Sequence, residues 1–226
     1  MAVTTPSKMT PAGRGVTLRR EWVWHVAALA APVALAGALT HPVVVEITTR
    51  APGWPGDNIA YIWLIHWLKQ AVTTGVSLFF DPYFYYPLGY DLSAIESTLA
   101  NTVPALPVAL LAGPVAAYNI ALLASFALTS YGMFLWVRAL TGNNVVALTC
   151  GIASAFFPFR LAHLPGHLPQ MATQWIPLCF YAVERYTRTR QTRWAAGVGV
   201  MVGLNALSSC CLLYTSDAAD DLLCVD

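Results

Sequence analysis

The chain has 226 residues, of which 57% are hydrophobic and only 10% are Asp, Glu, Lys or Arg. A soluble domain has about 25% charged residues, so the composition excludes a soluble enzyme, a nucleic-acid-binding protein and a disordered chain. Five stretches contain no charged residue: 22–45, 97–137, 139–159, 161–183 and 194–216. Several of them reach the roughly 20 apolar residues that cross a bilayer. The sequence therefore predicts an all-α fold, a polytopic transmembrane helical bundle.

The first apolar run, 22–45, follows a polar segment, 1–21, that contains Lys8, Arg14, Arg19 and Arg20. Its 24 residues exceed the 7–15 apolar residues of a cleaved signal peptide, so we expect a retained signal anchor. Since Lys and Arg accumulate in cytoplasmic loops, the N-terminus is predicted in the cytoplasm of a multi-pass inner (plasma) membrane protein.

A second basic cluster sets the expected topology; it consists of Arg185, Arg188, Arg190 and Arg193. If both basic clusters are cytoplasmic, an even number of spans separates them. Of five candidate segments, 98–114 is the weakest, because it carries three prolines and a short apolar core, typical of a re-entrant or interfacial segment. The expected spans within 22–207 are about 22–45, 115–137, 144–162, 166–184 and 194–209. Residues 46–114 then form one long extracytoplasmic loop.

This long loop contains eleven of the chain's 27 aromatic residues between positions 54 and 90. Amphipathic aromatic rings prefer the membrane surface, so we expect the loop to fold against it. A helix is predicted from about 58 to 72. Its polar side chains recur at 66, 69, 70 and 73, a narrow stripe typical of a helix that lies in the interface.

Asp57 is expected at or next to the start of this helix and has two interpretations. As an N-cap it would stabilise the helix by about 1 kcal/mol, and the helix dipole would favour its charge. As a catalytic carboxylate it would accept a proton from an acceptor hydroxyl. The two roles are compatible in principle, although a capped carboxylate is a weaker base. Spacing alone favours the cap.

The last residues, 210–226, differ in character from the rest. The string LLYTSDAADDLLCVD resembles translated sequencing-adapter read-through, and it follows the first part of a predicted span without an exit loop. We therefore expect a non-native tail and treat 1–209 as the front part of a longer protein. A genuine acidic extramembrane tail is the alternative.

Four strings carry a family resemblance: GDNIAYIWLIHWLKQAV, FFDPYFYYPLGYDL, AYNIALL and FPFRLAHLPGHLPQ. Over about residues 20–207 the chain resembles bacterial membrane glycosyltransferases of the GT-C class, which includes protein O-mannosyltransferases. The resemblance implies transfer of a sugar, as by a hexosyltransferase, from a polyprenyl-phosphate-linked donor to a glycan, lipid or protein acceptor outside the cytoplasm. It also implies that Asp57 is the catalytic base. The later spans and distal domain of that class are missing from this sequence.

Arg160, His163 and His167 are candidates for binding the donor phosphate. Arg suits phosphate recognition, but Arg160 could equally extend toward the outer headgroups. The intervening Pro165 and Gly166 argue against a continuous helix that would present both imidazoles on one face, as in a metalloprotease.

Asp81 and Asp91 are further candidates for substrate binding. Asp81 precedes a proline, which favours a turn role, and Asp91, like Glu96, is by default a solvated carboxylate. No Cys/His cluster has zinc-ligand spacing; we expect no cofactor, with a divalent cation left open.

Two rival functions remain on sequence grounds. A transporter or flippase would normally carry ionisable groups in mid-membrane, which the spans lack, although the prolines permit broken helices. In a non-catalytic membrane scaffold the aromatic loop would be a partner surface.

Overall fold

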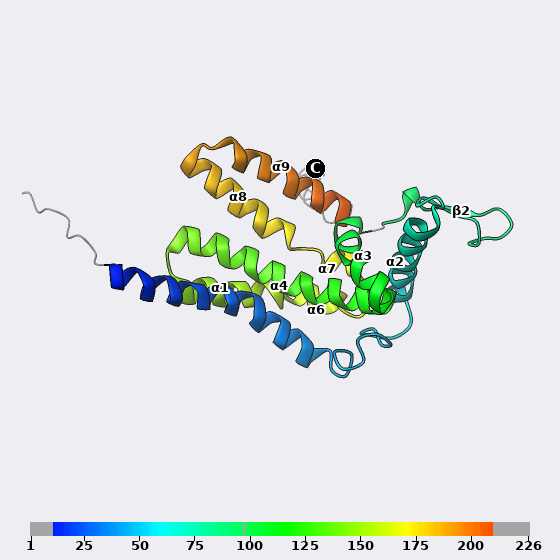
Figure 1. Ribbon diagram of the computed structural model, residues 1–226, viewed down its shortest axis with the longest axis horizontal. Helices are drawn as coiled ribbons and strands as arrows, with labels where there is room; N and C mark the ends of the chain where they lie inside the picture. Colours follow the sequence, from blue (N-terminus) through cyan, green and yellow to red (C-terminus); the bar gives the residue numbers. More distant parts are fainter. Residues whose placement is uncertain (1–10, 97, 210–226) are drawn as a thin grey trace, which may run out of the picture.

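The computed structural model describes residues 11–96 and 98–209, which are mostly helical (Figure 1). The helices are α1 (Pro11–Leu39), α2 (Asp57–Thr74), α3 (Leu99–Ala112), α4 (Pro114–Thr141), α5 (Asn144–Ala155), α6 (Pro158–His163), α7 (Leu168–Met171), α8 (Trp175–Thr189) and α9 (Thr192–Ser208), with a 3-10 turn η1 (Leu92–Ala94). The strands β1 (Phe80–Asp81) and β2 (Tyr90–Asp91) pair antiparallel. The expected non-native tail, 210–226, lies outside the described residues.

Three helical segments are long and apolar enough to cross a membrane: Glu21–Leu39, Pro114–Thr141 and Asn144–His163. They correspond to the first three predicted spans. The first ends at Leu39, six residues before the predicted end at 45. Pro42 explains the difference, because a proline disfavours helical geometry in the residue before it and ends the helix there.

The span expected over 166–184 is not one continuous helix. The structure has the four-residue α7 and the 15-residue α8, with a break at residues 172–174. Proline fits the first turn of a helix, whereas in the interior it removes a backbone hydrogen bond and favours a kink or break. Accordingly, Pro169 and Pro177 each lie within the first turn of a new helix.

Helix α4 is the centre of the packing, with α1, α3, α5 and α8 against it. The main core cluster includes Tyr118 and Phe126 of α4, Ile65 of α2, and Leu168 and Met171 of α7. Small residues permit close helix contacts, as is typical of membrane bundles. A Cβ atom on Gly151 of α5, for example, would lie 2.7 Å from the carbonyl oxygen of Ser130 on α4.

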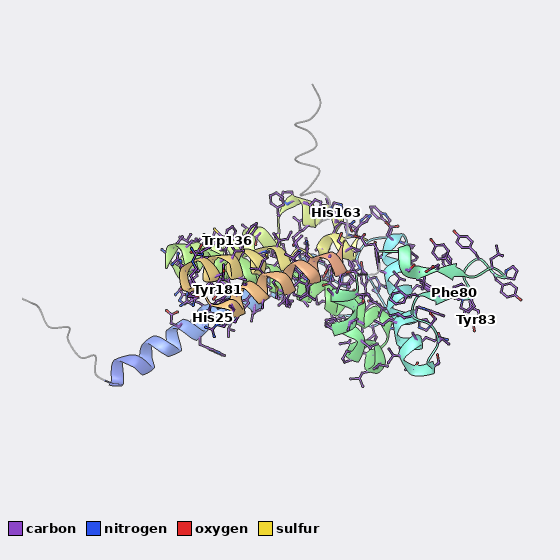
Figure 2. All side chains as sticks on the ribbon, turned by 90° about the horizontal axis from the view of Figure 1, so that it is seen from above. His25, Phe80, Tyr83, Trp136, His163 and Tyr181 are labelled. Carbon is purple, nitrogen blue, oxygen red and sulfur yellow. The ribbon has the colours of Figure 1, made fainter. Side chains whose placement is uncertain are left out.

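Helices α2 and α3 lie at one end of the bundle, and α2 crosses the long axis in both views (Figures 1 and 2). The helix predicted over 58–72 is confirmed, because α2 spans Asp57–Thr74. The segment 98–114 forms α3, a shorter apolar helix of 14 residues, which agrees with its exclusion from the full spans. The β1–β2 hairpin, absent from the sequence prediction, projects beyond α2, with Phe80 and Tyr83 at this end (Figure 2).

Candidate functional site

Asp57 is the first residue of α2, and its side chain does not cap the helix. The N-cap residue is Gly56, and no side chain bonds there as a cap. The neighbouring Asn58 closes the turn: its Oδ1 accepts from the backbone N–H groups of Gly56 (3.1 Å) and Ile59 (2.9 Å), and its Nδ2 donates to the Pro52 carbonyl. The N-cap interpretation of Asp57 is therefore wrong. The Asn58 side chain makes the hydrogen bonds to the backbone of this turn, and the Asp57 carboxylate remains outside it.

The Asp57 carboxylate lies against His167, which precedes α7. Its Oδ2 is 3.0 Å from His167 Nε2, and the two side chains are 64% and 43% exposed. A carboxylate oxygen only accepts, so this contact is favourable when Nε2 carries a hydrogen. The structure thus brings together two candidate residues that the sequence had placed in different roles.

Close backbone packing holds the two loops that carry this pair. Gly53 has φ +86°, and a Cβ atom there would lie 2.2 Å from the carbonyl oxygen of Pro165. Only glycine adopts such a φ freely and leaves room for this approach. On the other loop, a Cβ on Gly166 would lie 3.8 Å from Cβ of Asp57. The position of His167 relative to Asp57 is therefore set by the backbone.

His163 is the last residue of α6, and the helix does not continue to His167, as Pro165 and Gly166 predicted. Its Nδ1 donates to the Phe159 carbonyl oxygen at 2.7 Å. Its ring meets the His167 ring edge to face, with centroids 5.3 Å apart. Figure 2 shows His163 toward the α2 end of the bundle and His25 toward the other end.

An apolar groove of about 550 Å³ begins at Pro55 and Gly56, directly before Asp57. One wall is the α2 face with Ile59, Ala60, Trp63 and Leu64; the other consists of Phe84, Tyr90, Leu92 and Ile95. Trp63 and Phe84 have ring centroids 5.5 Å apart, so aromatic contacts hold the hairpin against α2. The lining is almost entirely apolar. Its size is that of a small-molecule site, and its chemistry suits an aliphatic chain.

Asp81 and Asp91 serve the hairpin. Asp81 is buried, and its Oδ1 accepts from the Tyr83 backbone N–H at 2.7 Å, the turn role favoured by the sequence. The Oδ1 of exposed Asp91 accepts from the Ser93 N–H at 2.8 Å and caps η1, and this bond lowers the pKa of the Asp91 carboxyl. Neither carboxylate belongs to the lining of the groove.

Arg160 is 1% exposed, so the interpretation of a side chain that extends toward the headgroups is wrong. Its guanidinium lies 4.8 Å from the Phe126 ring centroid. Its three nitrogens donate to neutral oxygens: the carbonyls of Ala155 and Met171 and the hydroxyls of Ser125, Thr129 and Thr173. With these partners the guanidinium is enclosed by protein and does not join the Asp57–His167 pair.

Sequence reasoning missed this polar network, although a signal was present. Ser125 and Thr129 are four residues apart in α4, which places both hydroxyls on one face of the helix. A buried arginine needs such acceptors.

Among residues 11–96 and 98–209, no group of three or more His, Cys, Asp or Glu side chains is arranged to hold a metal ion.

Comparison with known proteins gives no match: no family model, no curated protein and no solved structure is similar to this chain. The resemblance to the GT-C class therefore rests on the sequence strings alone, and the geometry around Asp57 has to be interpreted from its own chemistry.

Proposed function

We propose that this chain belongs to a membrane glycosyltransferase that uses a polyprenyl-phosphate-linked sugar as donor. The observation that carries the proposal is the exposed Asp57 carboxylate at the head of α2, beside a groove of about 550 Å³ with apolar walls. A transferase of this class needs a base that reaches an acceptor hydroxyl and an apolar surface for the donor's lipid. Both occur here within a few residues.

In the proposed reaction the Asp57 carboxylate removes the proton of an acceptor hydroxyl, and this proton ends on the carboxylate. The acceptor oxygen forms a bond to the anomeric carbon of the donor sugar. The bond between that carbon and the phosphate oxygen breaks, and the lipid phosphate leaves with the electron pair. A single displacement of this kind inverts the anomeric carbon. Part of the prenyl chain would lie in the groove between α2 and the hairpin.

The proposed orientation places the α2 end outside the cytoplasm. The turn between α8 and α9 lies at the opposite end of the molecule from α2, close to the end where α1 begins (Figure 1). Arg190 lies in this turn, and Arg188 and Arg193 lie at the adjoining ends of α8 and α9. Cytoplasmic placement of the basic residues then puts Asp57 on the outer side, where the acceptor of such an enzyme is found.

A transporter or flippase is the second candidate, and one observation favours it. Between Ala155 and Trp175 the chain forms only short helices around buried Arg160. Interrupted helices build many transporter sites. The partners of Arg160 are neutral oxygens of the protein, however, and a role in ion coupling would require this network to open.

Asp57→Asn tests the proposed function. Membranes that contain the full chain are supplied with polyprenyl-phosphate hexoses carrying a radiolabelled sugar, and transfer to the membrane fraction is measured. We expect a loss of about 100-fold or more, because a positioned general base contributes 10²–10⁴-fold, with an unchanged amount of inserted protein.

Glu46→Gln is the matched control, since Glu46 is a carboxylate of the same long loop that pairs with Arg50 instead. It should leave transfer unchanged. Full transfer by Asp57→Asn would rule out Asp57 as the base. Export of labelled lipid without transfer would favour the flippase.

A further inference from the structure

The close contact between His167 and Asp57 gives the imidazole a role different from phosphate binding. We propose that His167 is the positioning residue of the candidate base, an inference that rests on the proposed function. Its Nε2 lies 3.0 Å from Oδ2 of Asp57. Because one oxygen is engaged, the other, Oδ1, is left for the acceptor hydroxyl.

Asp57 needs such a partner because of its place in α2. At the first position of the helix its carboxylate is close to unpaired backbone N–H groups, which attract an anion. A carboxylate that turned onto them would be a weaker base and would no longer face the acceptor. Asn58 already occupies the turn, and His167 holds the carboxylate from the outer side.

The imidazole is itself held before any substrate binds. The contact of Gly53 with Pro165 joins the loop before α2 to the turn before α7, and Gly166 brings His167 next to Asp57. His163 packs edge to face on the His167 ring and is fixed by its own bond to the Phe159 carbonyl. A hydrogen-bond donor in a preset place orients a catalytic group without cost at the moment of reaction.

The same geometry argues against His167 as a phosphate ligand. A phosphate at this imidazole would lie close to the Asp57 carboxylate, and the two negative charges would repel each other. The Nε2 atom that would serve a phosphate already lies 3.0 Å from Oδ2. The role expected from the sequence is thus replaced by one that acts through Asp57.

Kinetics of two variants separate positioning from phosphate binding. His167→Gln retains an N–H donor near the position of Nε2, whereas His167→Leu has similar bulk and no donor. For transfer from a polyprenyl-phosphate hexose, we expect His167→Leu to lower kcat about 10-fold to 100-fold with an unchanged KM for the donor. His167→Gln should restore most of kcat. His66→Leu, on the exposed side of α2, is the control and should match the wild type.

A raised KM for the donor with unchanged kcat would overturn the proposal and favour a phosphate contact. Equal loss in the Leu and Gln variants would also overturn it, because the donor hydrogen would then be irrelevant. Wild-type membranes that transfer no sugar from these donors would count against the proposed function, and positioning of a base would fall with it. An active wild type with a fully active His167→Leu would remove the positioning role alone.

The contact itself is tested without any substrate. In protein labelled with ¹⁵N in its histidine rings, Asp57→Asn should shift the His167 imidazole signals in the NMR spectrum and leave those of His66 unchanged. Unchanged His167 signals would overturn the pairing, whatever the transfer assay shows.

Discussion

Arg160 and His167 are seven residues apart on one short segment, yet their environments are opposite. Arg160 is enclosed, lies over Phe126 and donates to several neutral oxygens. His167 is 43% exposed, and its imidazole pairs with the still more exposed Asp57. The difference shows that one α6–α7 segment carries both an enclosed cation and an accessible imidazole. Its buried cation contacts oxygens of α4 and of the residues on either side of α6, while its exposed imidazole contacts only the start of α2.

Contacts in the enclosed environment of Arg160 should contribute more to the free energy of unfolding than the exposed contact of His167. Removing one partner of a buried polar network leaves the others desolvated and unpaired, which costs about 1–3 kcal/mol for each group. An exposed ion pair contributes less than about 1 kcal/mol. Variants around Arg160 should therefore lower stability, whereas variants of the Asp57–His167 pair should lower transfer at nearly constant stability.

Arg160→Met should have the largest effect on stability. It retains bulk over Phe126 but removes all donors to the carbonyls of Ala155 and Met171, and we expect a loss of about 3–5 kcal/mol in the free energy of unfolding. The measurement is reversible unfolding of the purified protein in detergent micelles, followed by tryptophan fluorescence.

Arg138→Met is the matched control for that variant. Arg138 also lies near a phenylalanine ring, that of Phe134, but its side chain is 30% exposed and pairs with Glu21. We expect a loss below about 1 kcal/mol. Similar losses in the two variants would contradict the contrast between enclosed and accessible cations.

Asn58→Ala should have an intermediate effect on stability, and it should also lower sugar transfer. It removes three hydrogen bonds of the turn before α2, so we expect a loss of about 1–2 kcal/mol. The freed backbone N–H groups should attract the Asp57 carboxylate away from His167, and transfer should fall as well. Unfolding in micelles and the sugar-transfer assay measure the two effects.

Asn143→Ala provides the comparison, because Asn143 caps α5 through the N–H groups of Val145 and Val146 and lies outside the candidate site. It should reduce stability to a similar degree and leave transfer per folded molecule unchanged. If Asn58→Ala also kept full transfer, Asn58 would not control the orientation of Asp57.

The sequence predicted those elements whose signal is local. Charge-free apolar stretches identified α1, α4 and the α5–α6 segment, and polar spacing identified α2. It did not predict the break at 172–174. Hydropathy is averaged over a window and is blind to the positions of single prolines. Pro169 and Pro177 lie in the first turns of α7 and α8, where proline fits best. The hairpin was missed because each strand has only two residues.

The candidate site was predicted as residues but not as an arrangement. Asp57 and His167 were both singled out, but their contact depends on the approach of Gly53 to Pro165, which no local pattern encodes. The side chain that bonds the turn was expected to be Asp57, but it is Asn58; both residue types favour helix starts, and only the fold shows which one faces the turn. Arg160 was expected to contact either a phosphate or the outer headgroups, because four of its five acceptor residues are more than ten residues away in the sequence.

The pH dependence of the Asp91 cap should be the smallest of these effects. Asp91 is bonded to a backbone N–H group, whereas Asp57 lies beside an imidazole, so the two carboxylates can be compared. Its bond from the Ser93 N–H lowers its pKa in the folded chain, so the charged form is favoured by folding. This contribution is present above the ordinary carboxyl pKa of about 4 and is lost as the pH falls through the lower folded value.

Amide hydrogen exchange of Ser93, corrected for the intrinsic rate, should therefore show less protection at acid pH. Asp91→Asn retains the accepting oxygen without the charge, so its protection should be independent of pH in this range. A pH dependence equal to that of the wild type would assign the effect to another group, and the contrast between a carboxylate bound to the backbone and one held by an imidazole would lose its support.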